Sequence, residues 1–321
     1  MTKVLASPRL TLIGLIWVGI AVIAHYQLPG LPSWQLALPF AALASNLAAA
    51  LLVKPALRAS AGLFVFHVSL LGVMLLAGWG RLKHFDGRVE VVEGQAFSDA
   101  RAEITRYGAW HRNRLNEIEF IQGPYTIDYR PGLKRSHTRS EVYSDDGRAV
   151  VGDIDPLVLS GYRFYTTHNK GFALVVTWMP AAGQTETGAI HLPSFPMNDW
   201  RQESTWKPSG GPNLKWVLDP GIKLDFQQAW KLDSRQLKPV LKIQGKDQAI
   251  ELKPGQSASV PGGSIRFEAV RGWMGYRIFY DPTLPWLLAC AIVSVLALAW
   301  HLLGRLTLPK LSVKLAHERA A

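Results

Sequence analysis

Residues 59–94 read ASAGLFVFHVSLLGVMLLAGWGRLKHFDGRVEVVEG, and within this stretch the pattern changes in the way that decides the fold. From Ala59 to Gly80 there is no Asp, Glu, Lys or Arg, and the segment is long enough to cross a hydrocarbon core of about 30 Å as a helix. From Gly87 to Gly94 apolar and polar residues alternate between glycines, which is typical of a β-strand. The stretch therefore predicts a membrane helix followed by a β-rich domain.

Three other segments are nearly free of charge and about as long. They are Leu10 to Tyr26, Gln35 to Val53 and Leu284 to Gly304. Lys3 and Arg9 precede the first of these, as in a signal peptide, but no small-x-small cleavage site follows convincingly, and we interpret it as a retained helix. The predicted fold is thus a membrane protein with four transmembrane α-helices, arranged three plus one. A large, mainly-β extracytoplasmic domain lies between helices three and four.

The expected divisions follow from this pattern. Residues 1–80 form a three-helix membrane region, residues 81–282 the β-rich domain, residues 283–304 the fourth helix and residues 305–321 a basic cytoplasmic tail.

The formal charge of +11 and the pI near 9.8 are explained by membrane topology. Residues 81–282 hold 27 Lys and Arg against 23 Asp and Glu, whereas the remainder holds 8 against 1. Those eight lie at helix ends, while the loop from Gln27 to Trp34 has none. The positive-inside rule then places both termini in the cytoplasm and residues 81–282 outside it. We expect contact with membrane lipid and no nucleic-acid partner.

Cys290 is the single cysteine and lies in the fourth apolar segment, so the β-rich domain has no disulfide and depends on its own core. In that domain, Glu141 to Asp155 predicts two strands around a turn, and Leu157 to Thr167 and Phe172 to Met179 predict two more, split at Asn169-Lys-Gly171. Pro239 to Lys253 predicts a further hairpin that turns at Gly245-Lys-Asp247. The segment from Pro180 to Pro220 is rich in Gly, Pro, Ser and Trp and is expected to be irregular or a binding loop.

His67 is the first candidate for a functional residue because it lies well inside the third apolar segment. An ionisable side chain costs several kcal/mol there if it is charged, so it is expected to be neutral and to have a partner or a role. Neutral imidazole is a common ligand of haem iron. The alternative is an inter-helix hydrogen bond, for example with Ser69 or Asn46.

Three other histidines are weaker candidates. At about 1.5 Å per residue, His301 lies about 6 Å inside the cytoplasmic edge, near enough to pair with His67 or to act as an interfacial residue. His25 and His84 each lie at the outer end of a helix. The histidines of the β-rich domain have no ligand spacing, and the chain has no C-x-x-C-H, G-x-S-x-G, P-loop or H-E-x-x-H motif. Four tryptophans of the domain could stack a planar ligand, although core packing is the simpler interpretation. They are Trp178, Trp200, Trp206 and Trp216.

The third apolar segment and its continuation resemble the ResB family of cytochrome c biogenesis proteins. The resemblance is carried by Phe66-His-Val-Ser-Leu-Leu71 and by Gly78-Trp-Gly-Arg-Leu-Lys-His-Phe-Asp-Gly-Arg-Val-Glu-Val-Val-Glu-Gly-Gln-Ala-Phe97, and Tyr280-Asp-Pro282 is similar to the start of the family's last helix. The family has the same arrangement of three helices, an outer β-rich domain and a returning helix. At 321 residues this chain is short for the family, which puts part of an apocytochrome-docking surface in doubt.

The resemblance implies a subunit of the system II haem-attachment machinery in a bacterial inner membrane. Such a subunit works with a multi-helix partner of the CcsA or ResC type, moves haem b across the membrane and presents it to reduced apocytochrome c. It is not catalytic alone. The family's membrane histidine falls on His67, which implies a haem axial ligand. Two other classes remain: a membrane-anchored binding or scaffolding module without haem, and a b-type electron-transfer subunit, for which only His67 and His301 could supply both ligands.

Overall fold

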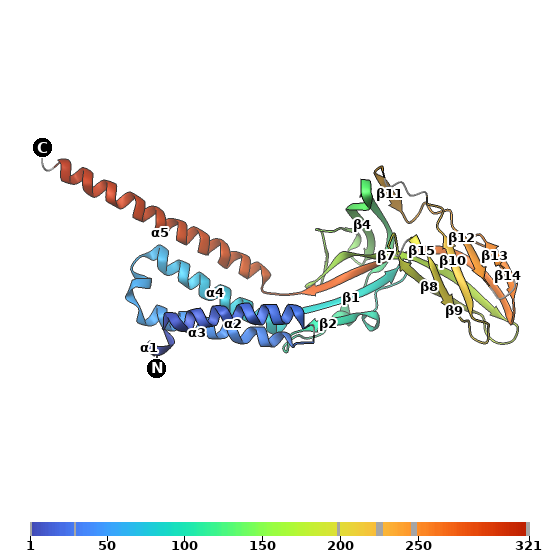
Figure 1. The fold of residues 1–321 in the computed structure, drawn as a ribbon, viewed down its shortest axis with the longest axis horizontal. Helices are drawn as coiled ribbons and strands as arrows, with labels where there is room; N and C mark the ends of the chain where they lie inside the picture. The colour runs from blue at the N-terminus through green and yellow to red at the C-terminus, as the bar shows by residue number, and fades with distance from the viewer. Residues whose placement is uncertain (1, 29, 198–199, 223–226, 245–248, 319–321) are drawn as a thin grey trace. The chain divides into compact units, whose positions relative to one another are not determined.

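The computed structural model describes residues 2–28, 30–197, 200–222, 227–244 and 249–318, with only the backbone for 306–318. The chain divides into two compact units. One comprises Met1–Asp86, Ile104–Arg112 and Tyr280–Ala321, and the other comprises Gly87–Glu103 and Asn113–Phe279. The first contains the described α-helices and the second nearly all the strands (Figure 1).

The first unit is built of apolar helices, and among the described residues four of them are long and apolar enough to cross a membrane. The helices are α1 (Thr2–Leu5), α2 (Pro8–Gln27), η1 (Ser33–Leu36), α3 (Ala37–Val53), η2 (Pro55–Arg58), α4 (Ala61–Lys83) and α5 (Leu284–Glu318). The candidate spans are α2, η1 with α3, α4, and α5 as far as Arg305. The prediction of four apolar helices with a large β-rich domain is confirmed. Helix α5 continues past Gly304, the last residue of the predicted span, to Glu318.

Asn46, a polar residue in the middle of α3, bonds through both its side-chain oxygen and its side-chain nitrogen to residues of the first two helices and the turn between them. Its Oδ1 accepts a hydrogen bond from Thr11 Oγ1 at 2.6 Å, and its Nδ2 donates to the carbonyls of Leu5 and of Ser7, the latter at 3.1 Å. A polar side chain in an apolar helix is tolerated when its donors and acceptors are satisfied in this way. Asn46 is therefore not the partner of His67.

In the described residues the strands form three sheets, in which the pairings that do not involve β1 are antiparallel, and this confirms the prediction of a β-rich domain. The largest has the order β2-β1-β15-β7-β6, with β14 also on β15 and β8 also on β7; the others are β13-β12-β10-β9 and β11-β3-β4-β5. The strands of the large sheet are β1 (Phe85–Val92), β2 (Glu103–Tyr107), β6 (Leu157–Leu159), β7 (Tyr162–Pro180), β8 (Glu186–Ser194), β14 (Ser257–Val260) and β15 (Gly263–Tyr280). The remaining strands are β3 (Ile121–Arg130), β4 (Lys134–Ser144), β5 (Gly147–Val151), β9 (Glu203–Trp206), β10 (Leu214–Asp219), β11 (Trp230–Asp233), β12 (Val240–Gln244) and β13 (Ala249–Leu252). The 3-10 helices η3 (Asp99–Arg101), η4 (Leu115–Glu117) and η5 (Pro131–Leu133) connect some of them.

The core of this unit is aromatic and includes one buried polar network. Tyr276 Oη donates to Gln122 Oε1 at 2.7 Å, and Ser140 Oγ lies 2.7 Å from the same hydroxyl and 2.8 Å from Gln122 Nε2. The three residues are nearly inaccessible and come from β15, β3 and β4. The network therefore fixes two sheets against each other, because each buried polar atom needs its partner.

Two predictions about this unit were wrong. β7 is one strand from Tyr162 to Pro180, not two. It stays paired with β15 through Lys170 and Gly171, and the register shifts between Met274 and Tyr276. The turn-like composition therefore causes an irregularity within the strand and does not end it. The segment from Pro180 to Pro220 contains β8, β9 and β10 and is not generally irregular. Trp178 and Trp216 are fully buried, as core packing requires. The predicted turn at Gly245–Asp247 lies outside the described residues.

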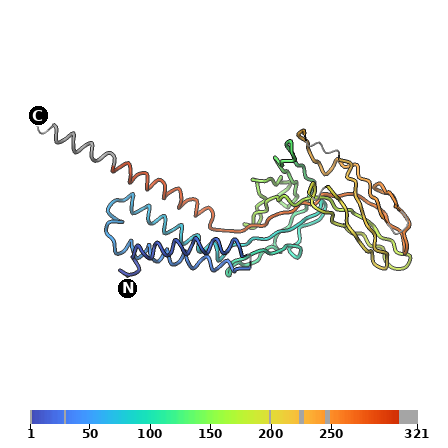
Figure 2. The backbone as a smooth tube through the Cα atoms, in the orientation of Figure 1, coloured from blue at the N-terminus to red at the C-terminus, as the bar shows by residue number. Residues whose placement is uncertain are grey.

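The backbone continues from α4 into β1 after a single residue, His84, and from β15 into α5 through residues 281–283 (Figure 2). The change of pattern near Gly80 thus corresponds to a helix that is followed at once by β1, the strand between β2 and β15 in the large sheet.

Candidate functional site

Helix α4 positions His67 and begins at a defined cap. Ser60 has an extended backbone, and its Oγ accepts a hydrogen bond from the Leu63 N–H at 3.2 Å, which satisfies one of the free donors of the first turn. His67 lies seven residues after this cap, about 10 Å along the helix axis. It is half-buried.

The imidazole of His67 is held in a defined orientation by its own helix. Its Nδ1 lies 2.8 Å from the carbonyl oxygen of Leu63, and its ring meets that of Phe66 edge-on at 5.1 Å. A carbonyl can only accept, so Nδ1 carries the proton, and in the neutral ring Nε2 keeps its lone pair. Nε2 has no hydrogen-bond partner among the described residues. A fixed Nδ1–H and an available Nε2 are the arrangement in which histidine binds a metal ion.

His301 is used differently, in the contact between α4 and α5. Its Nδ1 lies 2.6 Å from Ser60 Oγ, at the start of α4. Beside it, a Cβ on Gly62 would lie only 2.9 Å from the carbonyl oxygen of Ala297, so this glycine allows α5 to approach closely. Five residues of helix place His67 about 140° around α4 from Gly62. The structure therefore does not bring His67 and His301 together.

His25 and His84 are both buried. His25 lies near the C-terminal end of α2, and His84 lies between α4 and β1. Their exposed fractions are 5% and 4%, and His25 Nε2 and His84 Nδ1 have no hydrogen-bond partner in the described part of the chain. His25 also lines an apolar pocket of about 350 Å³ with Trp17 and Trp34. Burial lowers the pKa of His84 to about 4, and the Arg81 guanidinium adds to this, so His84 is neutral at ordinary pH. Among the described residues no hydrogen bond joins His25 to His84, and neither belongs to a group of three metal-ligating side chains.

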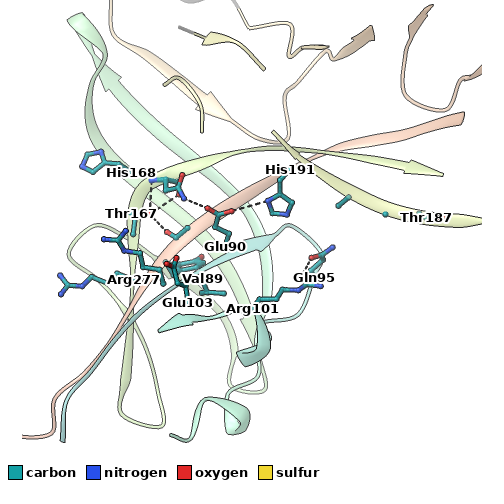
Figure 3. Close-up of a pocket in the computed structure, with 16 residues that line it drawn as sticks. Val89, Glu90, Gln95, Arg101, Glu103, Thr167, His168, Thr187, His191 and Arg277 are labelled. Carbon is teal, nitrogen blue, oxygen red and sulfur yellow. Dashed lines mark hydrogen bonds and ion pairs between the residues drawn. The ribbon is translucent and has the colours of Figure 1, made fainter. Parts of the chain in front are cut away.

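The β-rich unit contains a polar groove of about 1050 Å³ that the sequence did not reveal (Figure 3). Glu90 of β1 occupies its centre, accepts a hydrogen bond from Asn169 Nδ2 of β7 and lies 3.6 Å from His191 Nδ1 of β8. The His191 imidazole and the Asn169 amide lower the pKa of Glu90, which keeps the carboxylate ionised. His191 stacks on the buried Trp273 at 5.9 Å.

Cations surround this central pair in the groove. Arg88, Arg101 and Arg277 line it together with Glu103. The lining comes from strands separated by tens of residues, so no local motif could have marked it. The groove suits a polar or charged segment of a partner better than a porphyrin, because most of its lining is polar or small.

A catalytic arrangement is not evident in the described residues. No group of three His, Cys, Asp or Glu side chains could hold a metal ion there. In the described part of the chain, fold and site together define a protein with four helices able to cross a membrane and a β-rich domain, with an oriented imidazole on the third of these helices.

The comparison with known families agrees with this class. The model of the ResB-like family matches residues 57–208, from within η2 to just after β9, and confirms the resemblance to the ResB family of cytochrome c biogenesis proteins. This match supports a membrane location and a role in cytochrome c biogenesis. No curated protein matches the chain.

Proposed function

We propose that this chain is the ResB-type subunit of a cytochrome c haem-attachment complex, in which haem b is the cargo and His67 is one of its axial ligands. The observation that carries the proposal is the placement of His67 within the ResB-like region, with Nδ1 bonded to the Leu63 carbonyl and Nε2 available. Iron prefers a neutral imidazole nitrogen, and a membrane interior keeps imidazole neutral. The residues present therefore fit a haem ligand.

The second axial ligand would come from another subunit. His301 contacts Ser60 on the side of α4 that faces α5, about 140° from His67. The face that carries His67 is thus not the one that packs on α5, and His67 is half-buried on it, with Gly78 about 20° away around α4 packing against Ala37 and Phe40 of α3. A multi-helix partner of the CcsA or ResC type would supply the remaining ligand and the covalent chemistry, so this chain is not catalytic alone.

The proposed orientation follows from charge. Lys3, Arg9, Lys54 and Arg58 lie at the helix ends remote from the connections to the β-rich unit, and Lys310 and Lys314 belong to the last part of α5. Basic residues favour the cytoplasmic side. The termini would then be cytoplasmic in a bacterial inner membrane, and the β-rich domain would meet apocytochrome c outside.

The test is co-expression of the chain with its multi-helix partner, purification of the complex and measurement of its haem spectrum. His67→Ala should lose most of the haem and most of the cytochrome c output, whereas His301→Ala, a histidine change on the other side of α4, should keep both. Adding imidazole to a His67→Gly complex should restore part of the haem absorption. Equal haem content in all variants would exclude the ligand role.

A second candidate function, a membrane-anchored binding module without haem, is favoured by the polar groove around Glu90 and His191. It predicts that a Glu90→Gln, His191→Ala double variant loses capture of an exported partner. His67→Ala would then have no effect, and no preparation would contain haem.

A further inference from the structure

The segment Ile104–Arg112 is attached to the helices although it lies in sequence within the β-rich region. The Gly108 N–H donates to the His84 carbonyl at 2.8 Å, and the Trp110 N–H donates to the Leu82 carbonyl at 2.8 Å. These bonds use carbonyls at the end of α4, which have no partner within the helix. The segment is therefore fixed to the end of α4.

The same segment also contacts the ends of two other helices. Arg106 Nη2 donates to the His25 carbonyl in the last turns of α2 at 3.0 Å. Ser33 Oγ, at the start of η1, donates to the Tyr107 carbonyl at 2.8 Å. Residues 106–110 thus cross the ends of α2, η1 and α4 on one side of the helical unit.

The contact between Trp110 and Trp79 shows how far along the α4 span the segment lies. The two rings meet at 5.2 Å, and Trp79 lies within the α4 span, four residues before its end at Lys83. At about 1.5 Å per residue, Trp79 is about 6 Å inside the end of the helix. Lys83 Nζ lies 5.7 Å from the Trp79 ring. Trp110 is therefore at the level where tryptophans and basic residues border a bilayer.

Three large apolar or aromatic side chains of the segment are largely exposed. Tyr107 is 62% exposed, Trp110 is 52% exposed and Ile104 is 46% exposed. A cluster of this kind marks a surface that is covered by something other than water. It is continuous with the exposed apolar surface of α4, where Trp79 is 48% exposed, and the exposed Arg112 lies at its end. Aromatic rings beside a basic residue suit lipid headgroups and their ester carbonyls.

We propose that Ile104–Arg112 lies in the membrane–water interface, with Tyr107 and Trp110 among the lipid headgroups. The lipid surface is then the partner of this segment. The inference is independent of haem binding.

The single cysteine allows a direct test on the full chain. Cys290→Ala removes the native thiol, and Tyr107→Cys then offers one site for an environment-sensitive fluorophore without disturbing Trp110. The labelled protein is reconstituted in vesicles of phosphatidylethanolamine and phosphatidylglycerol, with or without a lipid spin-labelled at its headgroup. Ile154→Cys, at an 85% exposed position of the β-rich unit, is the aqueous control, and Ile292→Cys in α5 is the hydrocarbon control.

The expected result is several-fold stronger quenching by the headgroup spin label at position 107 than at position 154, with weaker quenching by iodide. If position 107 matched position 154, the segment would be in water and the proposal would be overturned. Protection from both quenchers would mean that protein covers the segment, which would overturn it equally. An Ile104→Cys label should repeat the result from the other end of the segment.

Discussion

His301 Nδ1 lies 2.6 Å from Ser60 Oγ, so the hydroxyl that caps α4 also holds α5. One serine thus contributes to the start of one span and to its contact with another. This shared role makes Ser60 a sensitive position.

Ser60→Ala should destabilise the protein by about 1–2 kcal/mol, because the helix cap and the contact with His301 are lost together. Chemical unfolding in detergent, followed by tryptophan fluorescence, measures the change. Ser45→Ala is the matched control, since Ser45 is exposed and bonds only to the Ala41 carbonyl of its own helix. Equal effects of the two changes would contradict the double role.

Gly62→Ala should separate α4 from α5, because the new methyl group would lie 2.9 Å from the Ala297 carbonyl oxygen. We expect a loss of about 1–3 kcal/mol, which is typical of overpacking. Gly19→Ala in α2 meets nothing within 4 Å and should be neutral or slightly stabilising. Thermal unfolding of both variants in the same detergent distinguishes these outcomes.

Tyr276→Phe should cost about 1–3 kcal/mol, because it leaves the buried Gln122 Oε1 without its donor. Tyr143→Phe removes a hydroxyl of an exposed tyrosine that bonds to Glu141 and should change stability little. The free energy of unfolding of the two variants is compared under one set of conditions. A similar small change in both would mean that the buried network contributes little.

Lys170 should make stability depend on pH. Its side chain is only 3% exposed, and burial, with the nearby Arg135, lowers its pKa to about 8 from 10.5. Between these values the unfolded chain binds a proton that the folded chain does not, so stability rises as pH increases from about 8 towards 10.5. Lys170→Met should remove this rise, and Lys215→Met, at an exposed lysine, should keep it. Unfolding midpoints measured across that pH range test the assignment.

The helices were predictable because an uncharged apolar run of about 20 residues is rare outside membrane-spanning helices. The strand after Gly87 was predictable because apolar and polar residues alternate along it. The long β7 was not, because Asn169-Lys-Gly171 has the composition of a turn, and only its pairing with β15 keeps it extended. The strands between Pro180 and Pro220 were hidden by a composition rich in Gly and Pro.

The position of His67 followed from the sequence, since an ionisable residue in an apolar segment is conspicuous. Which of its ring nitrogens carries the proton could be inferred only from the contact with the Leu63 carbonyl. The separation of His67 from His301 required the packing of α4 on α5. The groove around Glu90 and the attachment of Ile104–Arg112 to the helices arise from long-range contacts, which local patterns do not encode.

The bond from His67 Nδ1 to Leu63 has a thermodynamic consequence for anything that binds at Nε2. The ring gives up its rotational freedom when the helix folds, so little of that entropy is lost again on association. Nε2 should therefore bind a metal ion more tightly than the same nitrogen on a freely rotating ring, because less free energy is lost in ordering the side chain.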